Sequence, residues 1–263
     1  MKLDNIVSDL VQSAPSGELK EVQGDLECIL SNVSAKQVIV SSMENYTNEN
    51  FGVFSSSYIA SKFNKQKNSL KYIDYIGKQL FNIDIENGKA IDFEEFEPQV
   101  AYPEYYDDLV TKLTQYGEDY YPAVYAFTVI PGQNSLDIII IGQKLNKNNF
   151  YTGQWQSYYT LKDGLLNCNI KVGIHYYEDG NVRLNFLEHL ESVLNEESSS
   201  DIVNAIYQME SKIIVKIMEE FGELNQRYFK NLRRLLPVTR SKINWGKSIG
   251  NYKLGSDVVN KSL

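Results

Sequence analysis

The hydrophobic pattern is most regular between residues 123 and 190, where five apolar runs follow one another. The runs are AVYAFTVI, LDIIIIG, WQSYYTL, NIKVGIHYY and NVRLNFL. Turn residues separate them at Pro131-Gly132, Asn146 to Asn149, Asp163-Gly164 and Asp179-Gly180. Connections this short leave no room for a helical crossover, so the pattern predicts an antiparallel meander.

The first 50 residues instead repeat apolar positions at helical spacing. The longest stripe is Leu19, Val22, Leu26 and Ile29, and a shorter stripe precedes it at Leu3, Ile6 and Leu10. A third helix is predicted over residues 38–46. The pattern therefore predicts an N-terminal helical subdomain over residues 1–50.

Residues 51–200 are predicted to form a central β-sheet region with one intervening helix. Weak alternation over residues 72–76 and 81–85 predicts short strands before that helix. The helix is predicted to start at Pro103 and run to Gly117, with acidic residues in its first turn, where they oppose the helix dipole favourably. With the helices that flank the sheet, the chain is expected to adopt an α+β fold.

A long helix is predicted from Ile202 to about Leu235, within a segment over residues 201–236. The run Ser198 to Asp201 supplies candidate N-caps, and Pro237 ends the helix because proline offers no backbone N–H. One apolar stripe contains Ile202, Ile206, Met209, Ile213, Ile217 and Phe221, and a second beside it contains Val203, Tyr207, Ile214 and Met218. One sheet face cannot cover so wide an arc, so we expect a second apolar surface from a partner chain.

Charge is distributed unevenly along the 263 residues. The chain has a formal net charge of −8, but from Arg227 onward nine Lys or Arg stand against the single acid Asp257, so residues 1–226 carry −16. Such segregation indicates an anionic partner for the basic end, which the acidic body would repel. A solvated helix end, with cations favoured by the helix dipole, is the simpler alternative for Lys230, Arg233 and Arg234.

The segment over residues 237–263 is predicted to be an amphipathic C-terminal arm. Ile243, Trp245, Ile249 and Tyr252 recur at loosely helical spacing with cations between them. Its glycines each cost about 1 kcal/mol in a helix, so the arm is expected to become ordered only when it docks in an apolar groove. A disordered solubilising tail or a strand of the main fold remain alternatives.

The sequence offers little catalytic or metal-binding chemistry. Gly246-Lys247-Ser248 lacks the leading glycine of a phosphate-binding loop, because position 241 is serine. His175 lies within an apolar strand run and is read as a structural residue, and Glu178 to Asn181 as a tight hairpin turn rather than a calcium loop. We expect no enzyme activity, no metal and no cofactor.

Cysteine usage and hydropathy bear on where the protein is located. Two cysteines at no metal-like spacing, no signal-like start and no apolar run near 18 residues favour a cytoplasmic protein. A nucleic-acid partner is disfavoured because the acidic body would oppose it and no matching motif accompanies the charge.

Four stretches carry a resemblance to a known family. They are Ala14 to Leu19, Asn148 to Ser157, His175 to Val182, and Phe229 to Trp245; the longest tokens within them read HYYEDGNV and LPVTRSKINW. On these stretches the chain resembles the alpha subunit of the heterodimeric F-actin capping protein, whereas residues 51–145 match in layout alone. The family commonly reads FWNGRWRS near Phe150, where this chain carries Tyr151, Thr152, Gln154 and Gln156.

The resemblance implies both an architecture and a partner. It implies N-terminal helices, a central antiparallel sheet, a long helix across the sheet and a C-terminal arm. It further implies pairing with a beta subunit of similar fold, sheet to sheet and long helix to long helix, which would account for the wide apolar arc. The chain is then expected to depend on that partner for stability.

The resemblance also implies a function without catalysis. Members of the family cap the barbed ends of actin filaments without calcium and block subunit exchange. The expected actin-binding residues are Lys230, Arg233, Arg234, Arg240, Lys242, Trp245, Ile249 and Tyr252. Phosphoinositides and inhibitory regulators of capping are expected to compete for Lys230 and Arg234, and the protein is expected at the cortical actin cytoskeleton. The alternative is a peripheral membrane module that uses the basic arm to bind phosphoinositides.

Overall fold

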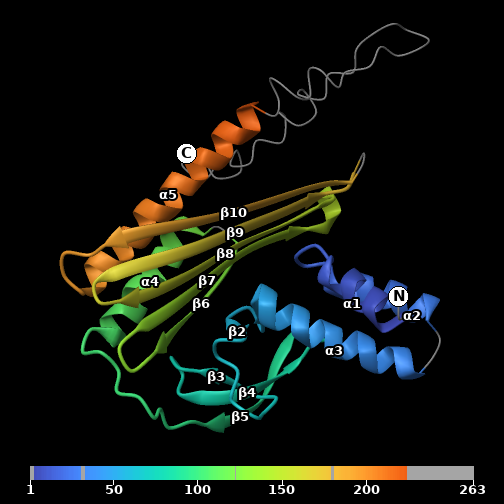
Figure 1. The fold of residues 1–263 in the computed structure, drawn as a ribbon, viewed down its shortest axis with the longest axis horizontal. Coiled ribbons are helices and arrows are strands. Elements are labelled where there is room, and N and C mark those ends of the chain that lie inside the picture. The colour runs from blue at the N-terminus through green and yellow to red at the C-terminus, as the bar shows by residue number, and fades with distance from the viewer. Residues whose placement is uncertain (1–2, 31–32, 122, 179–180, 224–263) are drawn as a thin grey trace, which may run out of the picture. The chain divides into compact units, whose positions relative to one another are not determined.

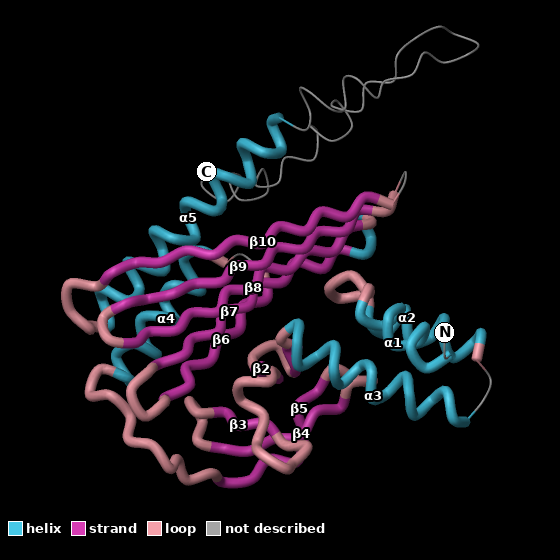
Figure 2. Tube along the Cα trace, in the orientation of Figure 1, coloured by secondary structure: helices cyan, strands magenta, loops and turns pink. Residues whose placement is uncertain are grey.

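The computed structural model describes residues 3–30, 33–121, 123–178 and 181–223 of the chain. It divides into two compact units, residues 1–206 and residues 207–263. The first unit is an α+β fold, as expected from the sequence, with helices and three antiparallel sheets (Figures 1 and 2).

Three helices open the chain: α1 (Leu3–Gln12), α2 (Leu19–Ile29) and α3 (Val33–Asn50). Together they confirm the predicted N-terminal helices, although α3 is longer than residues 38–46. Their shared core contains Val7, Val11, Leu26, Ile39, Met43 and Tyr46. The stripe Leu3, Ile6 and Leu10 lies on α1 as a helix, but on its exposed side, because Val7 and Val11 are the buried residues.

Two small sheets follow. The first pairs β1 (Gly52–Phe54) with β2 (Tyr58–Ala60), and the second has the order β3 (Tyr72–Asp74), β4 (Gln79–Asp84) and β5 (Lys89–Glu95). Their shared cluster is aromatic, with Tyr72 and Phe81 1% exposed. The short strands expected over residues 72–76 and 81–85 are therefore confirmed as β3 and β4.

The large sheet is a meander of five strands, β6 (Val124–Pro131), β7 (Leu136–Asn146), β8 (Tyr151–Lys162), β9 (Leu165–Tyr176) and β10 (Val182–Val193). All neighbours are antiparallel, in the order β10-β9-β8-β7-β6, so β10 and β6 are its two edges (Figure 1). A 3₁₀ turn, η1 (Lys147–Asn149), lies in the predicted turn between β7 and β8. The meander is confirmed, with β8 and β10 longer than their apolar runs.

The β6–β7 part of the sheet is covered on both faces. On one face, Phe51 and Ile59 from the β1–β2 region pack with Ile130 and Ile139. On the other lies α4 (Tyr106–Tyr120), whose Tyr106 hydroxyl donates to the Val129 carbonyl at 2.8 Å. This helix begins three residues later than predicted, because the Pro103 carbonyl accepts the Tyr106 N–H in a turn that precedes it.

The last described helix, α5 (Ser199–Glu223), is continuous over 25 residues. Ser198 caps it: its hydroxyl oxygen accepts the Asp201 N–H at 3.2 Å and its hydroxyl donates to the Asp201 carboxylate at 2.9 Å. The start of the predicted long helix is thus correct within three residues. Its predicted end at about Leu235 lies outside the described residues.

Candidate functional site

The residues expected to contact actin lie outside the part of the chain that the structure describes. These are Lys230, Arg233, Arg234, Arg240, Lys242, Trp245, Ile249 and Tyr252. Their roles remain predictions. The described residues instead reveal how the recognisable sequence stretches meet, and which surfaces are left open.

A buried polar cluster joins the N-terminal helices to one end of the large sheet. The Glu18 carboxylate accepts the Thr152 hydroxyl at 2.8 Å and lies 2.7 Å from Nδ1 of His175. Nε2 of His175 is 3.0 Å from the Asn181 side-chain oxygen. The His175 and Glu18 side chains are 9% and 16% exposed, so their polar atoms rely on these protein partners more than on water. The prediction of His175 as a structural residue fits this geometry.

Gly17 allows Glu18 to reach this position. Its φ of +82° is one that side chains rarely adopt, and an added Cβ would lie 2.4 Å from the Leu145 side chain. Arg183 of β10, directly opposite His175 on β9, donates to the Ser13 carbonyl at 2.7 Å. Both ends of the Ala14–Leu19 stretch are thus fixed to the sheet.

Tyr46 of α3 also contacts this cluster, through the Ala14–Leu19 stretch. Its hydroxyl donates to the Ala14 carbonyl at 3.0 Å. Burial raises the pKa of Tyr46 to about 12, and the nearby Glu18 carboxylate adds to the rise while Ser16 and Arg183 oppose it. The neutral phenol is therefore the form that the fold accommodates.

Two glutamines of β8 also hold a helix against the sheet. Gln154 and Gln156 both donate to the Asn50 carbonyl at the end of α3, the first at 3.4 Å. Lys171 of β9 donates to the Asn50 side chain at 2.7 Å, and burial lowers the pKa of this lysine. Two neutral amides therefore fix the end of α3 to the sheet.

The edge strand β10 is the first open surface. Among the described strands it pairs with β9 alone. Leu187 is 73% exposed and Val193 is 79% exposed, and both point to the same face because they are six residues apart on one strand. An edge of this length with exposed aliphatic side chains is a template for pairing with another strand.

Helix α5 provides a second open surface. Ile202 and Ile206 are buried, whereas Tyr207, Ile214 and Met218 are 43%, 45% and 61% exposed. The first predicted stripe is buried at Ile202, Ile206, Met209 and Ile213 and partly buried further on, whereas the second is exposed at Tyr207, Ile214 and Met218. Exposed apolar stripes on a helix of this length are typical of an interface.

Helix α1 adds a third exposed stripe. Leu3, Ile6 and Leu10 recur at helical spacing and are 52%, 39% and 47% exposed. Sequence reasoning identified these residues as a stripe but did not identify it as an open one. For β10, the sequence pattern did not indicate exposure, because Leu187 and Val193 would fit a buried strand face equally well.

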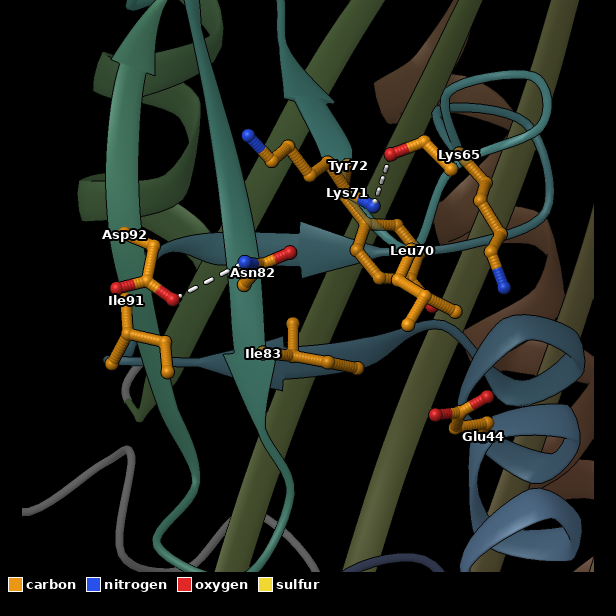
Figure 3. Close-up of a pocket in the computed structure, with 10 residues that line it drawn as sticks. Glu44, Lys65, Leu70, Lys71, Tyr72, Asn82, Ile83, Ile91 and Asp92 are labelled. Carbon is orange, nitrogen blue, oxygen red and sulfur yellow. Dashed lines mark hydrogen bonds between the residues drawn. The ribbon is translucent and has the colours of Figure 1, made fainter.

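Two hollows lie elsewhere in the first unit. Figure 3 shows one of about 460 Å³, with Tyr72 and Ile83 at its base and Glu44, Lys65 and Asp92 around it. Lys65 lies over the Tyr72 ring at 5.8 Å, and Asn82 donates to Asp92 at 3.2 Å. Charges of both signs are present and no nucleophile is paired with a base among its lining residues.

Metal and membrane features can be stated for the described residues alone. They contain no group of three or more His, Cys, Asp or Glu arranged to hold a metal ion. Among the described helices, none has the length and hydropathy required to span a membrane.

Comparison with known proteins gives a consistent result. A family described as F-actin capping protein alpha subunit matches residues 7–257. The F-actin-capping protein subunit alpha of Debaryomyces hansenii is 60% identical, with 98% of this chain and 97% of the relative covered. That of Candida albicans is 49% identical with 99% of both covered, and that of Saccharomyces cerevisiae is 35% identical with 98% and 97% covered.

The fold is also similar to a solved structure. The chain matches a structure titled as the homodimeric actin capping protein alpha subunit from Plasmodium berghei, with a TM-score of 0.72. The two are 22% identical, and the match covers 89% of this chain and 96% of the other. At this identity the likeness concerns the fold.

Proposed function

This chain belongs to the F-actin capping protein alpha subunit family, and we propose that it caps the barbed ends of actin filaments as one half of a heterodimer. The observation that carries the proposal is the charge segregation, with nine cations and one acid from Arg227 onward against a body of −16. A basic end on an acidic body directs the molecule to an acidic surface through that end alone. Capping is occupancy of the filament end and requires no catalysis.

The partner is proposed to be a beta subunit. The exposed residues of β10, α5 and α1 support this pairing, because each presents aliphatic side chains of the kind that interfaces cover. The related Plasmodium berghei protein is described as homodimeric, so a second copy of this chain is the competing partner. Light scattering of the chain expressed alone and together with a beta subunit distinguishes the two.

The actin contacts are proposed to be Lys230, Arg234 and Arg240, with Arg233 and Lys242 beside them. Their charges would first steer association and then pair with acidic residues of the filament end. Trp245, Ile249 and Tyr252 are proposed to supply the apolar contacts of the arm. Capping is expected to be unaffected by removal of calcium.

The test is seeded actin elongation with a Lys230→Ala, Arg234→Ala double variant of the heterodimer. Each lost pair is expected to cost about 2 kcal/mol, so the capping affinity should fall by roughly 1,000-fold while dimerisation is retained. The matched control removes two exposed cations of the body, Lys67→Ala and Lys89→Ala, and should cap normally. Unchanged capping by the first variant would refute the assignment.

The alternative function rests on the same cations. Lys230 and Arg234 would bind the headgroups of phosphoinositides, either to regulate capping or, in the alternative, to hold the protein at a membrane. Sedimentation with vesicles that contain a phosphoinositide measures this binding directly. Vesicle binding without any effect on filament elongation would favour the membrane module, whereas competition between vesicles and filament ends would favour capping that is regulated at the cell cortex.

A further inference from the structure

A second hollow, of about 530 Å³, lies beside β6, at the opposite edge of the large sheet from β10. One side is formed by α4 and the first residues of β6, and the other by the β1–β2 turn and the end of β3. Its main lining side chains are Tyr58, Asp74, Thr114, Glu118, Tyr125 and Phe127. All of these belong to the first compact unit.

The walls of this hollow are aromatic and held in place by the fold. The Tyr125 and Phe127 ring centres are 5.6 Å apart, and the Tyr125 hydroxyl donates to the Leu113 carbonyl at 2.9 Å. Gly117 makes room for the ring, because a Cβ there would lie 2.1 Å from it. On the opposite wall, the ring centres of Tyr58 and Phe93 are 5.1 Å apart.

Carboxylates surround these rings. Asp74 and Glu118 line the hollow, and Asp74 accepts hydrogen bonds from the Ile76 N–H at 3.2 Å and from Gln79 at 3.0 Å. Gln79 also donates to the Tyr58 hydroxyl, and Glu95 stands directly opposite Gln79 in the β4–β5 register. Cross-strand neighbours share a face, so Glu95 lies beside this group.

Within the described part of the chain, these carboxylates form no ion pair. The residues that line the hollow include no Lys, Arg or His, and no ion pair joins a described base to Asp74, Glu95 or Glu118. This differs from the hollow in Figure 3, where Lys65 and Lys71 lie among the acids. Aromatic faces bordered by unbalanced carboxylates suit a cation that is both planar and able to donate several hydrogen bonds.

We propose that this hollow binds an arginine side chain from an extended basic segment of a partner protein. The guanidinium would stack on the Tyr125–Phe127 wall and donate to Asp74 and Glu118. An extended segment fits because β6 is an edge strand that pairs with β7 alone among the described strands. Binding here leaves β10 open, so the inference does not rest on the proposed function.

The same charges argue against other classes of partner. The body of the chain carries −16, and the hollow adds aromatic surface to that negative field. Anionic membranes and nucleic acids would be repelled, whereas a basic peptide would be attracted. The basic residues from Arg227 onward are a second source of arginine, and the experiment must separate them from a partner.

The experiment is fluorescence anisotropy with the full-length chain and a labelled eight-residue peptide that alternates arginine with threonine. The neutral probe has citrulline in place of every arginine. We expect saturable binding of the arginine peptide and at least tenfold weaker binding of the citrulline peptide. Equal binding of the two peptides would overturn the proposal, because the hollow would then select shape without charge.

Variants locate the binding. Glu95→Gln with Glu118→Gln should weaken the arginine peptide roughly tenfold, and Phe127→Leu roughly threefold through loss of the ring face. The matched control, Glu86→Gln with Glu104→Gln, removes the same charge from exposed positions elsewhere and should change affinity less than twofold. Equal weakening by both pairs would show attraction to the acidic body as a whole and would overturn the site.

A competitor decides the source of the arginine. A synthetic peptide that copies residues 227–245 of this chain should displace the arginine probe no better than an unrelated peptide of equal charge. Displacement at a tenfold lower concentration would assign the hollow to the chain's own basic end and overturn the proposal of a partner.

Discussion

Strands β7 and β10 have similar length and similar aliphatic content, yet they differ in how far their side chains are buried and in how many strands pair with them. In β7, Ile138 to Ile141 are all 0% exposed, because the strand has a neighbour on each side and a covered surface on each face. In β10, Leu187 and Val193 are more than 70% exposed and only one side is paired among the described strands. Residues of this chain thus pair with β7 and cover it, whereas the second edge of β10 is suited to pair with a strand of another chain.

Removal of a β7 side chain is the strongest way to test this difference. Ile140→Ala should lower the free energy of unfolding by about 3 to 4 kcal/mol, because it removes three buried carbons and leaves a cavity. Urea denaturation followed by circular dichroism measures the change. A loss below about 1 kcal/mol would mean that the centre of the sheet is not closely packed.

The end of the sheet where Glu18 contacts β8 and β9 should show an intermediate effect. Glu18→Gln weakens the acceptor shared by Thr152 and His175, and we expect a loss of about 1 to 3 kcal/mol. A double-mutant cycle with His175→Gln should give a coupling energy near 1 kcal/mol, since the two side chains contact each other directly. Strict additivity of the two substitutions would contradict the contact.

The cluster around Glu18 and Tyr46 should also respond to alkaline pH. The pKa of Tyr46 is raised from the ordinary value of 10 to about 12, so the unfolded chain releases this proton at a lower pH than the folded chain. The contribution of Tyr46 to the free energy of unfolding is therefore fully present below pH 10. It falls between pH 10 and 12 by up to about 1.4 kcal/mol per pH unit. Comparison with Tyr46→Phe isolates the contribution, because other buried tyrosines titrate in the same range. An identical slope for both proteins would contradict the assignment.

The exposed middle of β10 should show the smallest effect on the chain itself. Leu187→Ala with Val193→Ala should change the free energy of unfolding by less than about 0.5 kcal/mol, because both side chains are solvated. The same pair should weaken assembly with the partner measurably by analytical ultracentrifugation. A large loss of stability without any effect on assembly would place β10 inside the chain's own core.

Much of the fold follows from local sequence patterns. Successive apolar runs separated by short turns predicted the order and direction of β6 to β10. The run Ser198 to Asp201 before an apolar stripe predicted the start of α5 within three residues. Both signals work because each depends on neighbours close in the sequence. The start of α4 was misplaced because Pro103 can begin either a helix or the turn that precedes it.

The candidate surfaces depended on contacts between distant residues. Leu3, Ile6 and Leu10 form as good a stripe as Val7 and Val11, and only the packing of α1 on α3 decides which stripe is buried. Glu18, Thr152 and His175 come from three separate stretches, and no spacing in the chain indicates that they meet. The hollow beside β6 likewise joins residues from four different segments.

The sequence by itself determined the elements, the α+β class, the segregation of charge and the stretches by which the family is recognised. Only the tertiary structure decided which apolar stripe faces the core, which strand lies at the open edge, and which carboxylates lack a cation within the described residues. The physical reason is that periodicity records the side-chain preferences of one segment, whereas burial and ion pairing depend on what other segments bring to it.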